Sequence, residues 1–436
     1  MYLTPTSPVS LTAERSPWLR GPIRVPGDAA ASRLALLLAA MARGESVNES
    51  LSGSPDIPPL IAAIEQLGVH IARQGACWHV EGIGVGGFLA PAGPIDVSAM
   101  GEGALLLIAL LAAHDFESRF TGVPASAWID ALLDFIHRNG SRVERDGINV
   151  MVRAPRFGVP LDLALPPGAS ALQAPLLLQS LVLTGTSVLH LPEPGGDAAE
   201  GVLAAFGAKI TDTAEETGTR VAVEGMAPLR ALAFGVPGDP VLAAFPAVAA
   251  LIAPDSEITV EALSLNHSRL AVLDALQMLG GDIALEAPKR PARDTADLVA
   301  RYSKLTGTVI PADLGIDLDD FAILAVAAAF AEGETLLEGL SEGQKRLSLS
   351  RALRANGVPC EERPQGLAIT GRARVPGGGK LFGRLDPKLS MSFLVLGMAA
   401  DKPVTIDDGG VMAELFPGFA AAFEHVGASF STGKPA

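Results

Sequence analysis

The chain is poor in cysteine and histidine, and this excludes several classes of site. It has two cysteines in 436 residues, Cys77 and Cys360, far apart in sequence. They make neither a disulfide framework nor a zinc pattern, and they suit a reducing cytoplasm. The seven histidines are scattered, with no pair at the spacing of metal ligands. We therefore expect a cytoplasmic protein without a bound metal.

Long hydrophobic runs and excess positive charge are also missing. The longest apolar run, residues 104–113, covers only about half of a membrane span and is better interpreted as a buried helix. Residues 1–20 show no basic start followed by an apolar run, so we expect no signal peptide. Lys plus Arg number 33 against 48 Asp plus Glu, a formal net charge of −15. This balance argues against nucleic acid and anionic membranes as partners.

The sequence has enough apolar residues to fill large cores. Hydrophobic residues make up 49% of the chain and charged residues 19%, which is typical of a globular protein. A chain of 436 residues exceeds what one hydrophobic core usually supports. We therefore expect two domains.

An internal repeat organises almost the whole chain. Each of six copies is interpreted as a strand, a turn rich in Gly, Pro or Asp, an apolar helix, a second strand, a second helix and a last strand. The second helix of each copy is predicted to end at a glycine, because glycine adopts a left-handed conformation cheaply. These glycines are Gly68, Gly140, Gly207, Gly280, Gly357 and Gly427.

The first helix of each copy has almost no polar face. The run "ILAVAAAFA" (residues 323–331) is an example. Helices of this kind belong inside a domain, with sheets packed around them. The pattern predicts a βαβαββ unit repeated six times, with three units in each domain.

The order of these motifs resembles the enolpyruvyl transferase family, most closely its 3-phosphoshikimate 1-carboxyvinyltransferase (EPSP synthase) branch. The resemblance covers about residues 20–430. It rests on "VPGD" before "LLLAAMARGES", Gly101, Gln173 before "LLLQSLVLTG", "VPGDPVLAAFPAVAALI", "DLDDFAILAVAAAFAEGETLLEGL" and "LDPKLSMSFLVLGMAADKPVTIDD". It implies an α/β protein with two inside-out barrel domains, each of three repeats, joined by a double crossover.

The resemblance also implies domain bounds and a reaction. Residues 25–235 would form the first domain, and residues 1–24 plus 236–436 the second. A ligand cleft between them would take shikimate 3-phosphate and phosphoenolpyruvate and release phosphate, with no metal or organic cofactor. We expect a monomer or a weak oligomer whose partner is a small molecule, in aromatic amino acid biosynthesis by the shikimate pathway.

Such a reaction requires cations that hold phosphates and carboxylates, together with groups that move protons. By resemblance, the catalytic candidates are Asp320 and Glu342. The substrate-binding candidates are Ser32, Arg33, Gln173, Lys345, Asp386 and Lys388.

Several positions depart from the family pattern. Ala29 and Ala30 stand where the family has Lys and Ser, Leu34 and Leu105 where it has Arg, and Glu102 where it has Thr. Each charged hydrogen bond lost in this way costs about 1.5–3 kcal/mol. The sequence therefore predicts a degenerate active site and argues against ordinary turnover.

Each candidate also has a structural alternative. The first loop can be a turn that caps a core helix. Asp320 can be a helix N-cap or first-turn carboxylate, and Gln173 a polar cap. Glu342 and Lys345 can form a solvated i, i+3 salt bridge. Asp386 and Lys388, which flank Pro387, can lie in a plain loop.

Three functional hypotheses remain open. The first is a shikimate-type enolpyruvyl transferase with an eroded or redirected site. The second is an enzyme on the same fold with a less anionic substrate, which uses Asp320, Glu342, Lys345 and Lys388. The third is a non-catalytic homologue that acts as a partner or regulatory subunit.

Overall fold

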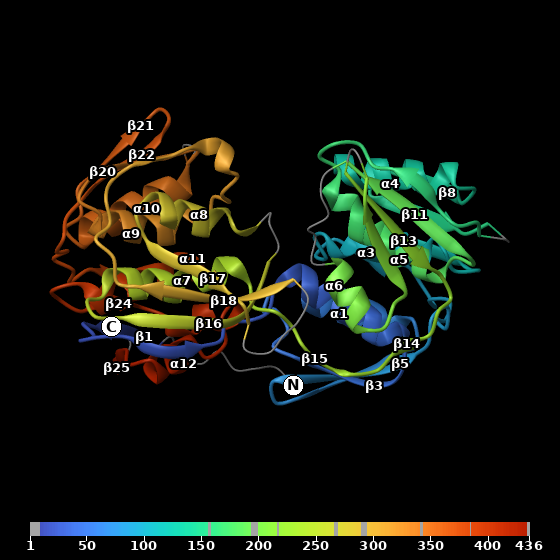
Figure 1. Cartoon of the computed structure of the whole chain (residues 1–436), viewed down its shortest axis with the longest axis horizontal. Coiled ribbons are helices and arrows are strands. Elements are labelled where there is room, and N and C mark those ends of the chain that lie inside the picture. Colours follow the sequence, from blue (N-terminus) through green and yellow to red (C-terminus); the bar gives the residue numbers. More distant parts are fainter. Residues whose placement is uncertain are drawn as a thin grey trace. The chain divides into compact units, whose positions relative to one another are not determined.

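The computed structural model describes residues 9–155, 158–192, 199–215, 218–265, 269–288, 294–340, 343–383 and 385–433. Two compact units divide the chain (Figure 1). We call Gly27–Val236 the N-terminal unit, and Met1–Pro26 together with Pro237–Ala436 the C-terminal unit. The chain therefore begins in the C-terminal unit, passes into the N-terminal unit after Pro26, and returns at Pro237.

Three sheets belong to the N-terminal unit. The first has the order β14 (Leu229–Arg230), β3 (Ala42–Glu49), β5 (Cys77–Ile83), β4 (His70–Gln74), with β15 (Ala233–Gly235) also paired to β3. The second has the order β6 (Ile95–Asp96), β7 (Glu117–Thr121), β9 (Asn149–Arg153), β8 (Arg142–Asp146). The third has the order β10 (Asp162–Ala164), β11 (Thr186–Leu191), β13 (Thr219–Glu224), β12 (Ile210–Ala214).

Three further sheets belong to the C-terminal unit. The first has the order β2 (Arg20–Ile23), β16 (Glu257–Ser264), β18 (Thr295–Arg301), β17 (Asp282–Glu286). The second has the order β19 (Val309–Ile310), β20 (Gly333–Glu338), β22 (Gly366–Gly371), β21 (Cys360–Arg363). The third has the order β23 (Lys380–Leu381), β24 (Val404–Ile406), β1 (Ser10–Glu14), β25 (Ser429–Gly433).

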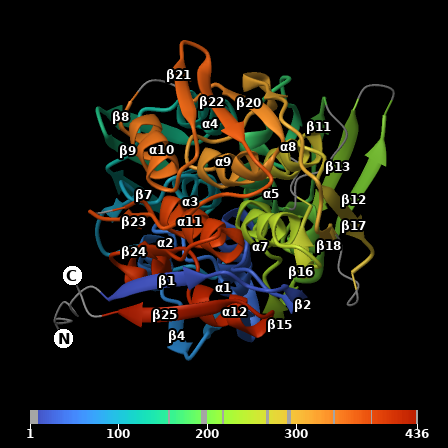
Figure 2. The same ribbon diagram turned by 90° about the vertical axis from the view of Figure 1, so that its left-hand side faces the viewer.

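The strand directions follow one pattern in all six sheets. The first pair is parallel and the next two pairs are antiparallel. Strands β1 and β2 complete two sheets of the C-terminal unit, and β1 lies beside β25 (Figure 2).

Six apolar helices fill the interiors of the two units. They are α1 (Ala29–Met41), α3 (Gly103–Leu111) and α5 (Gln173–Val182) in one, and α7 (Pro240–Ile252), α9 (Phe321–Phe330) and α11 (Pro387–Ala399) in the other. Every residue of α3, α7 and α9 is buried. The run at residues 104–113 is therefore confirmed as a buried helix, because it lies in α3 and the turn after it.

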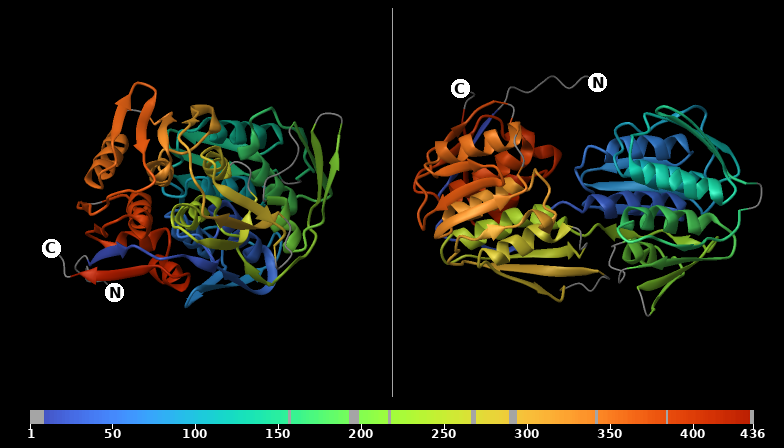
Figure 3. Two further views of the ribbon diagram at one scale, coloured as in Figure 1. Left: turned by 60° about the vertical axis from the view of Figure 1, so that its left-hand side comes forward. Right: turned by 90° about the horizontal axis from the view of Figure 1, so that it is seen from above.

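The remaining helices pack around these cores. They are α2 (Ile57–Gln66), α4 (Ala127–Arg138), α6 (Ala199–Ala205), α8 (Ala271–Met278), α10 (Gln344–Ala355) and α12 (Phe419–His425), with short 3₁₀ turns at Ser170–Leu172, Ala312–Leu314 and Gly409–Glu414. Figure 3 shows the helices of each unit running beside one another. Within the described ranges, no helix is long and apolar enough to cross a membrane.

The glycines predicted to end the outer helices have the expected conformation. The φ angles of Gly68, Gly140, Gly207, Gly280, Gly357 and Gly427 lie between 75° and 108°. Residues other than glycine are strained at positive φ angles of this size, because their Cβ atom meets the backbone. The predicted helix ends are therefore confirmed.

Candidate functional site

The loop before α1 is a capped helix start. The Asp28 side chain accepts a hydrogen bond from the Ala31 amide at 2.9 Å. Ser32, which is fully buried, donates from Oγ to the Asp28 carbonyl at 2.7 Å and accepts from the Ser52 amide at 2.8 Å. The hydroxyl of Ser32 is thus engaged inside the loop. A turn that caps a core helix accounts for these contacts.

Arg33 is buried and paired with two carboxylates. Its Nε donates to Asp56 Oδ2 at 2.5 Å, and its Nη1 donates to Glu102 Oε2 at 2.7 Å. Asp56 directly precedes α2, and Glu102 directly precedes α3. Three elements of the N-terminal unit therefore converge on this guanidinium. Their two carboxylates occupy donors that an anionic ligand would need.

The other candidate of the N-terminal unit, Gln173, is also engaged. It is the first residue of α5, and its Nε2 donates to Glu200 Oε1 at 2.6 Å in a buried pair. Leu34 and Leu105, at the positions where the family has arginine, both belong to the hydrophobic core of this unit. They therefore face the interior, where an ionic ligand would have to be desolvated.

In the C-terminal unit, Asp320 and Lys388 form a buried ion pair. Lys388 Nζ lies 2.5 Å from Asp320 Oδ1, and the two side chains are 18% and 4% exposed. Asp320 stands at the N-cap of α9, but its side chain makes no capping hydrogen bond. The N-cap position that the sequence offered as an alternative for Asp320 is therefore confirmed, although its carboxylate pairs with Lys388 and not with the helix amides.

Burial raises the pKa of Asp320, because a carboxylate removed from water is costly to ionise. The ammonium of Lys388 opposes this shift by its charge and its hydrogen bond. Asp317 adds to the rise, and Arg269 opposes it. The result is a carboxylate better suited to exchange a proton than an exposed aspartate is.

Asp386 caps α11. Its Oδ1 accepts from the amides of Lys388 at 2.9 Å and Leu389 at 3.2 Å, and Pro387 takes the first helical position. The plain-loop interpretation of this segment is wrong, because Asp followed by Pro begins a helix here. Lys388 consequently lies in the first turn of α11, directed toward the start of α9 by its bond to Asp320.

Lys345 lies in the first turn of α10 and donates to Asp319. That hydrogen bond raises the pKa of the Lys345 ammonium. Glu342, the other half of the predicted i, i+3 pair, lies outside the described residues. The pairing of Lys345 with Asp319 could not be foreseen, because the two residues lie on different elements.

A cavity of about 220 Å³ lies at the starts of α9, α10 and α11. Lys345, Asp319 and Asp386 line it, together with Gln344 and Ser348. Its apolar wall consists of Leu318, Ala322, Leu340, Leu349, Leu385 and Leu389. Lys345 and Asp386 are thus brought to one cavity, whereas Asp320 and Lys388 pair beside it without lining it.

Sequence reasoning missed the partners that hold the candidates by hydrogen bonds. Asp56, Glu200 and Asp319 hold Arg33, Gln173 and Lys345 respectively. Each of the three partners lies near the start of a helix, but nothing in the sequence connects it to the residue that it holds. A further missed pair is Arg269 with the N-cap Asp239, at 3.0 Å.

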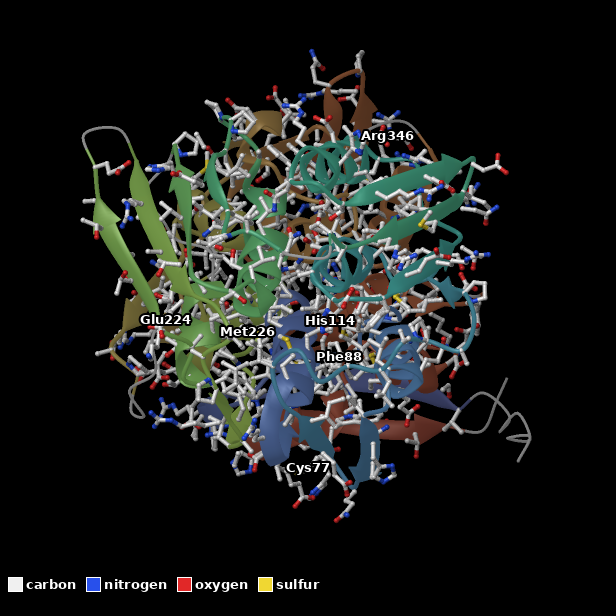
Figure 4. The ribbon with its side chains drawn as sticks, turned by 90° about the vertical axis from the view of Figure 1, so that its right-hand side faces the viewer. Cys77, Phe88, His114, Glu224, Met226 and Arg346 are labelled. Atoms are coloured by element: carbon white, nitrogen blue, oxygen red, sulfur yellow. The ribbon has the colours of Figure 1, made fainter. Side chains whose placement is uncertain are left out.

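His114 shows how an isolated histidine is used in the core. It is buried, its Nδ1 lies 3.0 Å from the Leu110 carbonyl, and its ring stacks on Phe88 with centroids 5.3 Å apart (Figure 4). Burial lowers the pKa of this imidazole. In the described part of the chain, no group of three or more His, Cys, Asp or Glu side chains could hold a metal ion.

Comparison with known proteins places this arrangement in a family. Residues 14–423 match the family model of EPSP synthase (3-phosphoshikimate 1-carboxyvinyltransferase). The chain is 36% identical to the 3-phosphoshikimate 1-carboxyvinyltransferase of Mesorhizobium japonicum, covering 96% of this chain and 97% of that protein. It is 33% identical to the protein of that name from Pseudomonas sp. (strain PG2982), covering 97% of each.

Solved structures agree. The EPSP synthase of Acinetobacter baumannii superposes with a TM-score of 0.79 at 25% identity, over 98% of this chain and 100% of that one. The enolpyruvyl transferase NikO of Streptomyces tendae, at 17% identity, has a TM-score of 0.69 and shows the fold alone. The predicted α/β fold with two inside-out barrel domains is confirmed, and the chain belongs to the EPSP synthase family.

Proposed function

We propose that this family member has lost the ordinary reaction of shikimate 3-phosphate with phosphoenolpyruvate, and that its remaining chemistry resides in the C-terminal unit and serves a less anionic small molecule. The observation that carries the proposal is the state of Arg33. Its guanidinium is buried and bonded to Asp56 and Glu102, so the cation nearest the first loop is already neutralised. Two phosphates and two carboxylates cannot be held without free cations.

The positions around Arg33 support the same conclusion. Ala29 and Ala30 offer no side-chain donors at the start of α1. Leu34 and Leu105 are packed in the core. The α1 amides alone give weaker anion binding than amides assisted by Lys, Ser and Arg.

The C-terminal unit keeps groups that can move protons. A substrate hydroxyl that displaces the Lys388 ammonium from Asp320 would meet a carboxylate whose raised pKa suits it to accept a proton. Lys345 and Asp386 would orient the ligand from the neighbouring cavity, whose leucine-rich wall favours an apolar portion. Asp320 is the catalytic candidate in this scheme. The substrate would be bound by Lys388, Lys345 and Asp386. The role of Glu342 stays a prediction from the resemblance.

A phosphate-release assay tests the proposal. The purified protein is incubated with shikimate 3-phosphate and phosphoenolpyruvate, with the Mesorhizobium japonicum relative under identical conditions as the positive control. We expect release that depends on both substrates from the relative but not from this chain, and no calorimetric binding of either compound at micromolar concentration. Release at a rate comparable with that of the relative would refute the proposal.

A second candidate function, a non-catalytic partner subunit, is favoured by one observation. Leu34 and Leu105 are integrated into the core rather than turned to solvent. Saturable binding of a small neutral hydroxy compound that is weakened by Asp320→Asn supports the enzyme. Absence of small-molecule binding, together with a stable complex with an EPSP synthase of the same cell that keeps the family's Lys, Ser and Arg, supports the partner subunit.

A further inference from the structure

The two carboxylates on Arg33 differ in how firmly they are held. The Asp56 side chain is 11% exposed and lies against a guanidinium side chain that is 9% exposed. The Glu102 side chain is 71% exposed and reaches Nη1 from the solvent side. Asp56 is therefore the permanent counter-ion of a buried arginine, which one carboxylate is enough to neutralise. Glu102 is a second, exchangeable anion.

We propose that Glu102 is a built-in carboxylate ligand of Arg33, which holds the position of an external anion and excludes small phosphates and carboxylates from the start of α3. With Glu102 in place, the cluster of one guanidinium and two carboxylates carries a charge of +1 − 2 = −1. An approaching phosphate meets this net negative charge at close range, and one N–H of Nη1 is already donated to Glu102. Without the charge of Glu102, Asp56 alone compensates the guanidinium, and one more N–H is available to an external anion.

The backbone at this point cannot replace the arginine. The amides of Gly103, Ala104 and Leu105 already donate to the carbonyls of Met100, Gly101 and Glu102. The first turn of α3 therefore has no spare donors among these three. Binding of an anion at this end of the helix therefore depends on Arg33, and Glu102 controls whether an external anion can reach it.

This inference goes beyond the proposed function, because it attributes the loss of anion binding to a residue gained rather than to residues lost. It rests on the proposed function for one point, that the native chain binds anions poorly. The consequence is a gain of binding from a single neutral substitution.

Calorimetric titration of inorganic phosphate, at low ionic strength to limit screening, tests this. Glu102→Gln is compared with the native chain and with Glu117→Gln. Glu117 is a carboxylate of the same unit, on β7, paired with Arg119 at 2.8 Å, and its substitution changes the net charge equally. We expect Glu102→Gln to bind phosphate at least about tenfold more tightly than the native chain, since a like charge a few ångströms away is removed. Glu117→Gln should match the native chain.

A third variant locates the bound phosphate. Arg33→Lys in the Glu102→Gln background keeps a positive charge beside Asp56 but removes the guanidinium fork, so most of the gain should disappear. The inference is overturned if Glu102→Gln shows no gain, if Glu117→Gln gains equally, or if the double variant keeps the full gain. Native turnover of shikimate 3-phosphate would instead overturn the proposed function and leave this comparison of variants intact.

Discussion

In the two units, cations near helix starts are neutralised in different ways. In the N-terminal unit, Arg33 is held by Asp56 and the exposed Glu102. In the C-terminal unit, Lys388 pairs with the buried Asp320, and Lys345 pairs with the exposed Asp319. The comparison shows that carboxylates of the protein itself can neutralise cations near helix starts while the barrel fold is kept. Fold and ligand chemistry are separable at these positions.

Arg33→Met removes the cation that has two carboxylate partners, and we expect it to lower the free energy of unfolding the most. It leaves Asp56 buried beside an apolar chain, and Asp56 Oδ1 already has no hydrogen-bond partner among the described residues. Removing one partner of a buried pair costs about 3–5 kcal/mol. Urea unfolding followed by the fluorescence of Trp78 and Trp128, both in the N-terminal unit, measures the loss. Arg119→Met, at an exposed pair, should cost less than about 1 kcal/mol, and equal losses would contradict the prediction.

Lys388→Met makes the corresponding break in the C-terminal unit. We expect a smaller loss, about 2–3 kcal/mol, because the buried Asp320 can neutralise itself by taking up a proton. The loss should therefore shrink as the pH is lowered. Lys345→Met is the matched control, since its pair with Asp319 is exposed and contributes under about 1 kcal/mol. A loss from Lys388→Met that does not depend on pH would show that Asp320 stays ionised.

The sequence was sufficient for the architecture because the relevant signals are local. Apolar runs without a polar face specify buried helices, and Gly68 and its five counterparts end the outer ones. Side-chain partners are not local: Arg33 and Asp56 are 23 residues apart, and Asp320 and Lys388 are 68 apart. Tertiary packing decides these pairs, so the candidates can be named from the sequence but their partners cannot.

One local signal in the sequence argues against the plain-loop alternative. Asp386 followed by Pro387 is a helix start, with the aspartate as N-cap and proline at the first position. The helix start places Lys388 in the first turn of α11. That placement is what aims its ammonium at Asp320.

Asp320→Asn tests how the buried carboxylate of the C-terminal unit makes stability depend on pH. Burial raises the pKa of Asp320 above its ordinary value of 3.8. A group with a raised pKa in the folded state contributes stability that is full below the unfolded pKa and is lost as the pH rises through the folded pKa. The stability of the native chain relative to Asp320→Asn should thus fall as the pH is raised from about 3.8. Urea unfolding at a series of pH values measures this, and Asp319→Asn controls for removal of a neighbouring charge. If the stability of the native chain relative to Asp320→Asn rises with pH, the pKa of Asp320 is lowered in the folded chain and not raised.

Asp386→Ala has the smallest expected effect and isolates the start of α11 from its ion pair. The carboxylate accepts from the amides of Lys388 and Leu389, and its loss leaves these two donors to water. Such caps contribute about 0.5–2 kcal/mol, and because Asp386 is exposed we expect about 1 kcal/mol. Asp386→Asn keeps an acceptor oxygen and should lose only a few tenths of a kcal/mol. If alanine and asparagine cost the same, the charge of Asp386 rather than its cap hydrogen bonds stabilises the helix start. The placement of Lys388 would then depend on Asp320 alone.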